Sequence, residues 1–152
     1  MKTLLKGSAL LLAISLPAPA MADVVSICFF QQENANNTRT DVFRQVVILG
    51  AGSTPYDAEQ RAKKTTSASD YADVNCYTSG DAEMNGGWYA ILKSGRTKDS
   101  AGKPVERYVA GFGPSRDEAV QKATERLKSL PGPTREHLDG KKVVDAKEFG
   151  DQ

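Results

Sequence analysis

The chain has 152 residues, of which 20 are Lys or Arg, 19 are Asp or Glu and one is His, so its formal charge at pH 7 is +1. This near-neutral balance, without a basic run, excludes long-range attraction to nucleic acid or anionic lipid, and we expect neither as a partner. One histidine and two cysteines do not supply the usual zinc ligands, so we expect no metal and no cofactor.

Residues 1–22 have the parts of a secretory signal peptide. Lys2 and Lys6 form its positive end, residues 8–16 form an apolar stretch too short to span a bilayer, and residues 20–22 form a small-x-small cleavage site. A buried N-terminal helix is the alternative, but two prolines end the apolar run before the cleavage site. Cleavage would remove both lysines and leave a near-neutral chain at 23–152, which we expect to be soluble, in the periplasm or secreted.

The exported part keeps two cysteines, Cys28 and Cys76, which are 48 positions apart. In an oxidising compartment such a pair is expected to form a disulfide. The alternative, a reactive thiol pair, is disfavoured because the Cys-x-x-Cys spacing of redox enzymes is absent.

The first half of the chain predicts two strands followed by a helix. The predicted elements are a strand at 24–30, a polar loop at 31–41, a strand at 42–49 and a helix at about 55–66. Gly52 permits a tight turn after the second strand, and Thr54 is a good N-cap for the helix.

The second half predicts the same succession. Its elements are a strand at 88–93, a hairpin loop at 94–103, a strand at 105–112 and a helix at about 116–130. Gly113 ends the second strand, and Ser115 with Glu118 forms a capping box. Ala119 and Ala123 recur at helical spacing and predict a buried helix face.

Residues 71–87 join the halves and could form an extra strand near Cys76. Residues 132–152 are mostly charged. Their only apolar pair is Val143-Val144, and although a short strand or helix could dock there, we expect a mobile end. His137 lies in this segment and is expected to be exposed rather than catalytic.

The two halves align when position 48 is laid on position 109. This alignment lays residues 48–54 on 109–115, the helical residues 57–62 on 118–123, and residues 27–30 on 88–91. We therefore predict an α+β fold with a four-stranded, or five-stranded, antiparallel sheet and both helices on one face. It would be a single domain at 23–131 made of two ββα repeats, at about 24–70 and 85–131. Two separate lobes would each have too small a core.

The string Trp88-x-Ala90-Ile91, a hairpin, and then Gly113-x-Ser115-x-x-Glu118-Ala119-x-x-x-Ala123 resembles a class of small exported bacterial proteins. Proteins of that class duplicate a Trp-x-Ala-Ile strand and a Gly-x-Ser helix start. The class has no established activity, so the resemblance implies no ligand and no site residue.

We predict no catalytic residue. Glu106 is the best single carboxylate candidate for a hydrolase, and Glu33 and Glu83 lie in predicted loops, but no pair can be placed across a cleft.

The leading hypothesis is an exported, non-catalytic binding protein of the inhibitor, immunity or envelope accessory type, with another protein as its partner. It would use polar hairpin loops and an exposed sheet face. The candidate surface residues are Asn36, Arg39, Trp88, Tyr89, Arg96, Lys98 and Tyr108. For the aromatic residues the alternative is core packing. The alternative functions are a small exported hydrolase using carboxylates and a structural envelope component.

Overall fold

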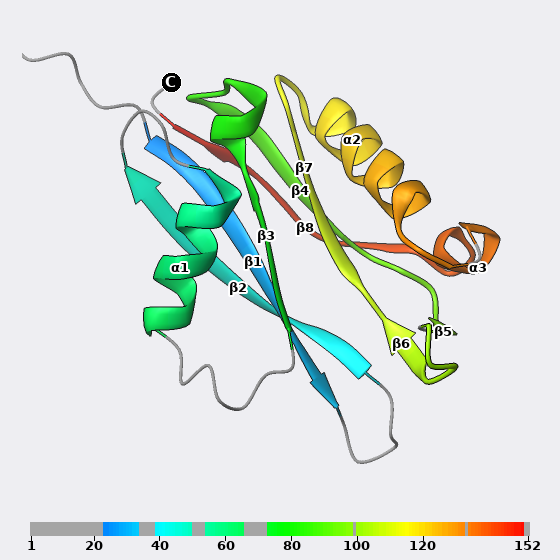
Figure 1. Cartoon of the computed structure of the whole chain (residues 1–152). Helices are drawn as coiled ribbons and strands as arrows, with labels where there is room; N and C mark the ends of the chain where they lie inside the picture. The colour runs from blue at the N-terminus through cyan, green and yellow to red at the C-terminus, as the bar shows by residue number, and fades with distance from the viewer. Residues whose placement is uncertain are drawn as a thin grey trace, which may run out of the picture.

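The computed structural model describes residues 23–33, 39–49, 54–65, 73–98, 100–132 and 134–150 (Figure 1). The predicted signal peptide, Asn36 and Gly52 lie outside the described residues. The elements, in chain order, are β1 (Asp23–Glu33), β2 (Arg39–Leu49), α1 (Pro55–Thr65), β3 (Asp73–Thr78), the 3-10 helix η2 (Ser79–Ala82), β4 (Gly87–Lys93), β5 (Thr97–Lys98), β6 (Pro104–Glu106), β7 (Tyr108–Gly113), α2 (Arg116–Ser129), α3 (Thr134–Leu138) and β8 (Lys142–Phe149).

The mixed α+β class is confirmed, but the strands form two sheets instead of the single sheet predicted. The first sheet has the order β3-β1-β2-β6-β5 and the second has the order β7-β4-β8. Only β2 and β6 pair in parallel; the other described pairings are antiparallel. Because Arg107 alone separates β6 from β7, one extended stretch of chain leaves the first sheet and enters the second.

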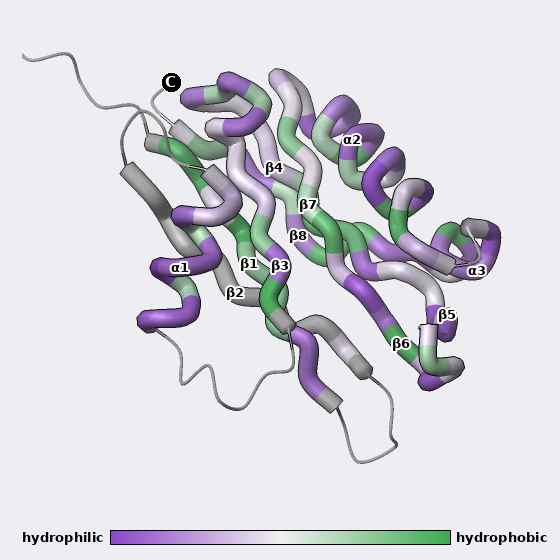
Figure 2. The backbone as a smooth tube through the Cα atoms, viewed as in Figure 1, coloured by the Kyte–Doolittle hydropathy of each residue, from purple (hydrophilic) through white to green (hydrophobic). Residues whose placement is uncertain are grey.

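The two sheets pack face to face, with one long helix outside each of them (Figure 1). On β1, Ile27 and Phe29 belong to the core between the sheets, together with Tyr89 and Ile91 of β4. The alternate β1 residues, among them Phe30, pack instead against α1. Figure 2 shows hydrophobic stretches on the central strands and hydrophilic stretches along α1 and α2.

The prediction that both helices cover the same face is therefore wrong. Its physical cause lies in the central strands, which are apolar on both faces. Residues 24–30 of β1 are all buried, so their sequence is a continuous run without the alternation that marks a half-exposed strand. Such a strand needs a covering layer on each face. For β1, α1 covers one face and the second sheet covers the other.

The first half has the order β1-β2-α1-β3, and the second half has the corresponding order β4-β7-α2-β8 with the short elements β5, β6 and α3 inserted. The first strand is central in both cases, with β1 between β2 and β3, and β4 between β7 and β8. The predicted ββα units therefore lack one strand each, and the duplication itself stays a prediction.

The last strand of the second half lies in the segment that was expected to be a mobile end. That expectation is wrong for residues 134–149, because β8 pairs with β4 from Lys142 opposite Lys93 to Phe149 opposite Gly87. The strand tolerates its charged composition because it is at the edge of the sheet and leaves many side chains exposed.

The alignment that lays position 48 on position 109 fits the helices but not the first strands. It makes Ala58 of α1 and Ala119 of α2 equivalent, and both are fully buried on the inner faces of their helices. The same alignment equates Cys28 with Tyr89, although Cys28 faces α1 and Tyr89 faces the other sheet. Moving the alignment by one position pairs Cys28 with Ala90, which faces α2, because such a slip exchanges the faces of a strand.

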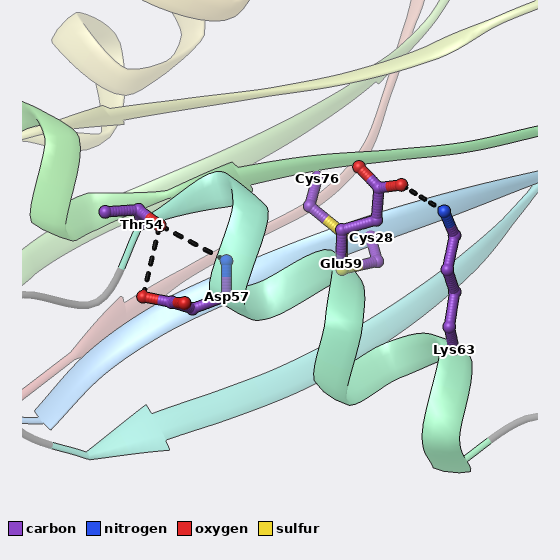
Figure 3. Close-up of a disulfide and its surroundings, with 6 residues drawn as sticks. All are labelled: Cys28, Thr54, Asp57, Glu59, Lys63 and Cys76. Atoms are coloured by element: carbon purple, nitrogen blue, oxygen red, sulfur yellow. Dashed lines mark hydrogen bonds and ion pairs between the residues drawn. A yellow bond between two sulfur atoms is a disulfide. The ribbon is translucent and has the colours of Figure 1, made fainter.

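The predicted disulfide between Cys28 and Cys76 is confirmed. The two residues are direct cross-strand partners on β1 and β3, with their Cα atoms 4.1 Å apart, beneath α1 (Figure 3). Their sequence separation of 48 encloses β2 and α1. Closing a loop of this length in the unfolded chain stabilises the folded state by about 4 kcal/mol on a chain-entropy estimate.

Both long helices begin in the same way. The Thr54 hydroxyl accepts a bond from the Asp57 amide at 3.2 Å, and the Ser115 hydroxyl accepts one from the Glu118 amide at 3.3 Å (Figure 3 shows the first). Each cap satisfies a backbone N–H that the helix itself cannot.

Glycine at position 111 lets α2 approach β7 closely. A Cβ atom there would lie 2.3 Å from the Ala119 carbonyl oxygen and 2.3 Å from the Ala123 amide nitrogen. Gly113 is also crowded, with a would-be Cβ 2.8 Å from the Ala119 amide nitrogen. Because these neighbours are helix backbone, no side-chain rearrangement relieves the overlap.

We expect Gly111→Ala to lower the free energy of unfolding by about 3 kcal/mol or more, because α2 must move off the sheet. Chemical denaturation of the disulfide-bonded protein measures this. The control is Gly102→Ala, where a Cβ meets nothing within 4 Å and only the positive φ of 77° costs about 1 kcal/mol. Equal losses in the two variants would contradict the close packing.

Candidate functional site

The aromatic residues predicted for the binding surface contribute to the core. Tyr89 is 2% exposed and lies between the sheets, where its hydroxyl donates to Asp145 at 2.9 Å. Tyr108 stacks on Phe29 with ring centroids 5.6 Å apart, and half-buried Trp88 packs beneath α2. The expected exposed aromatic sheet face is therefore wrong, because that face meets the other sheet.

The polar surface candidates in the described chain lie at one end of the first sheet, where Val105 of β6 pairs with Arg39 of β2 on one side and with Thr97 of β5 on the other. Arg96 and Lys98 are exposed in the predicted hairpin loop at 94–103, where Lys98 belongs to β5, whereas nothing is described of the Arg39 side chain. The base of this loop is held by α3: Gly95 donates its amide to the His137 carbonyl at 3.1 Å, and the Thr97 hydroxyl donates to Glu136 at 3.2 Å. The loop is thus part of the packed fold rather than a free polar arm.

His137 is 1% exposed, so the expectation of an exposed histidine is wrong. Its Nε2 lies 3.1 Å from the Pro131 carbonyl oxygen, which can only accept, so Nε2 carries the proton. Its Nδ1 is buried without a hydrogen-bond partner among the described residues. The side chain fastens α3 to the end of α2, a role that its polar surroundings in the sequence do not reveal.

We expect His137→Ala to lower the free energy of unfolding by about 2–3 kcal/mol, because it leaves a cavity and removes a buried hydrogen bond. Amide hydrogen exchange at Gly95 should become faster. The Gly95 amide donates to the residue 137 carbonyl, and this bond opens more often when α3 is held less firmly. The matched control is Arg135→Ala on the same helix, whose ion pair with Asp139 lies at the surface, with an expected loss below about 1 kcal/mol. Similar losses in both variants would refute the anchoring role.

Of the carboxylates considered for hydrolysis, Glu83 and Glu106 lie on separate elements, and nothing is described of the Glu33 side chain. Glu106 is in an ion pair with Lys93 at 3.0 Å, and Glu83 is exposed at the end of η2. Within the described ranges, no three His, Cys, Asp or Glu side chains gather closely enough to hold a metal ion.

The sequence patterns did not predict a groove that lies between α2 and the connection from β3 to β4. It consists of two adjoining hollows of 310 and 390 Å³, which share Ala82, Phe112 and Lys122. We call it the α2 groove. Its lining residues on α2 run from Glu118 to Ser129. These two residues are eleven positions apart, and at a helical rise of about 1.5 Å per residue the groove is about 16 Å long.

Arg126 lies half-buried in the α2 groove and connects three elements. Its Nη1 donates to the Ala110 carbonyl of β7, the edge strand of its sheet. Its guanidinium carbon lies 4.7 Å from the ring centroid of Tyr77 on β3 and 5.8 Å from that of Phe112. Cation–π contacts of this kind fix the planar group in place.

Burial and charge act in opposite directions at this site. Burial lowers the pKa of Arg126, and Tyr77 and Asp81 partly oppose that shift. Burial likewise raises the pKa of Asp81, against the effect of Arg126. Among the described residues, no carboxylate forms an ion pair with the Arg126 guanidinium.

Local sequence patterns could not reveal this arrangement. The surroundings of Arg126 in the sequence are typical of a solvated helix position, and Tyr77 and Ala110 meet it only because the β3 and β7 edges lie near each other in the fold. The groove is thus a product of tertiary packing.

Comparison with protein-family models, curated proteins and solved structures finds no match to this chain. In the part of the chain that the structure describes, no helix has the length and apolar character needed to cross a membrane. We therefore infer the function from the geometry of the fold and the groove.

Proposed function

We propose that this chain is an exported, non-catalytic binding protein whose α2 groove holds an extended segment of a partner protein. The observation that carries the proposal is the groove itself, an open channel about 16 Å long. An extended peptide advances about 3.3 Å per residue, so the channel suits about five residues. Apolar walls at Met84 and Phe112 and charges at Lys122 and Arg126 would contact such a segment.

The lining side chains favour binding over catalysis, because they are engaged with one another. Lys122 pairs with Glu125 at 3.3 Å, and Glu118 belongs to the cap of α2. The Ser129 hydroxyl donates to the Arg126 carbonyl at 2.8 Å, so it faces no general base. His137, the chain's one histidine, is not among the residues that line the groove.

Export is supported by the disulfide between Cys28 and Cys76, which suits an oxidising compartment. The predicted signal peptide at residues 1–22 points the same way, to the periplasm or the exterior. Within this compartment an inhibitor, an immunity factor or an envelope accessory would each bind a protein partner.

The proposal is tested by titrating the ¹⁵N-labelled, disulfide-bonded protein with a pool of acetylated and amidated pentapeptides randomised at every position. We expect NMR amide shifts at residues of the α2 groove, including Met84, Phe112 and Lys122. Ala82→Trp should abolish these shifts, because the indole fills the groove at a residue shared by both hollows. The matched control is Ala101→Trp, an exposed alanine outside the groove, which should retain them.

Three results would contradict the proposal. Shifts that persist in Ala82→Trp would place the binding site elsewhere. Cleavage of the pool, followed by mass spectrometry, would favour the hydrolase alternative. No shifts at millimolar peptide would leave the structural envelope component as the better hypothesis.

A further inference from the structure

Arg126 is the one cation of the α2 groove that, among the described residues, lacks an ion pair. Lys122 has Glu125 as its partner, and no carboxylate of the described chain pairs with the Arg126 guanidinium. Asp81 is close enough to shift the pKa of Arg126 but lies beyond ion-pair distance. The Arg126 guanidinium is therefore a groove cation for which the described chain supplies no ion-pair partner.

The guanidinium is also held in position before any ligand arrives. Its bond to the Ala110 carbonyl and its contacts with the Tyr77 and Phe112 rings restrict the side chain. A fixed arginine loses little conformational entropy on binding, and its planar fork of five N–H donors matches a carboxylate. Within the described chain a single hydrogen bond, to Ala110, uses these donors, so others remain for a ligand.

We propose that the α2 groove selects a peptide segment with a Glu or Asp side chain, whose carboxylate binds Arg126. This inference rests on the proposed function, namely that the groove holds a peptide. The lining continues past Arg126 to Ser129, nearly one helical turn further along α2. A chain can thus pass Arg126 in both directions, which favours an internal side chain over a chain terminus as the source of the carboxylate.

The experiment compares three pentapeptide pools on the disulfide-bonded protein by NMR titration. All have four randomised flanking positions without Asp or Glu. The first has a central Glu and an amidated end, the second a central Gln and an amidated end, and the third a central Gln and a free carboxylate end. We expect the first pool to bind about tenfold more tightly than the other two, because a charge-assisted pair forms in a half-buried setting.

Substitutions test whether Arg126 is the source of this preference. Arg126→Gln should remove it, and Arg126→Lys should restore it only in part, because lysine keeps the charge but not the fork. The matched control is Arg116→Gln, an exposed arginine in the first turn of the same helix, which should keep the tenfold preference. Thermal unfolding of each variant separates loss of binding from loss of fold, and Arg126→Lys serves if Arg126→Gln does not fold.

The outcomes distinguish this inference from the proposed function. Equal binding of the Glu and Gln pools, or a preference that survives in both Arg126 variants at full strength, would overturn the carboxylate inference and leave the peptide groove in place. A free-carboxylate pool that matches the Glu pool would overturn the side-chain source. Absence of binding by all pools would overturn the proposed function itself.

Discussion

The apolar layer between the two sheets is the constraint on which the rest of the structure depends. Ile27 and Phe29 of β1 meet Tyr89 and Ile91 of β4 in this layer. Fully burying side chains of this size contributes about 1.5–3 kcal/mol each, and neither sheet could leave its inner face in water at that cost. With the inner faces in contact, only the outer faces remain for α1 and α2. The α2 groove accordingly lies between a helix and a connection rather than on the inner face of either sheet.

Features that depend on residues close together in the sequence could be predicted. Which element packs against each face of a strand could not. The helix starts at Thr54 and Ser115 depend on residues three positions apart, and the cysteine pair depends on the compartment and on spacing. The continuous run at 24–30, in contrast, fits a strand buried on both faces equally well with a helix or with a sheet on either side. β8 was missed because an edge strand pairs through its backbone and does not need an apolar pattern.

The same ambiguity explains why the predicted site residues were misplaced. A strand aromatic such as Tyr89 has the same sequence signature in a core as on an open face, and only the packing of the second sheet decides between them. Arg126 shows the converse, since its sequence surroundings are those of a solvated helix residue although the fold brings two rings and an edge carbonyl to it. The α2 groove follows from the sandwich, because two stacked sheets bring the β3 and β7 edges together beside α2.

The most direct test of the sandwich is a set of side-chain NOEs from Ile27 in the methyl-labelled, disulfide-bonded protein. The two-sheet packing predicts NOEs from the Ile27 methyl groups to Tyr89 or Ile91, across the layer between the sheets. NOEs from Ile27 to Ala119 or Ala123 of α2, without any to β4 side chains on the inner face, would contradict it. Such a pattern would place that helix directly on the first sheet and remove the layer that holds the two halves together.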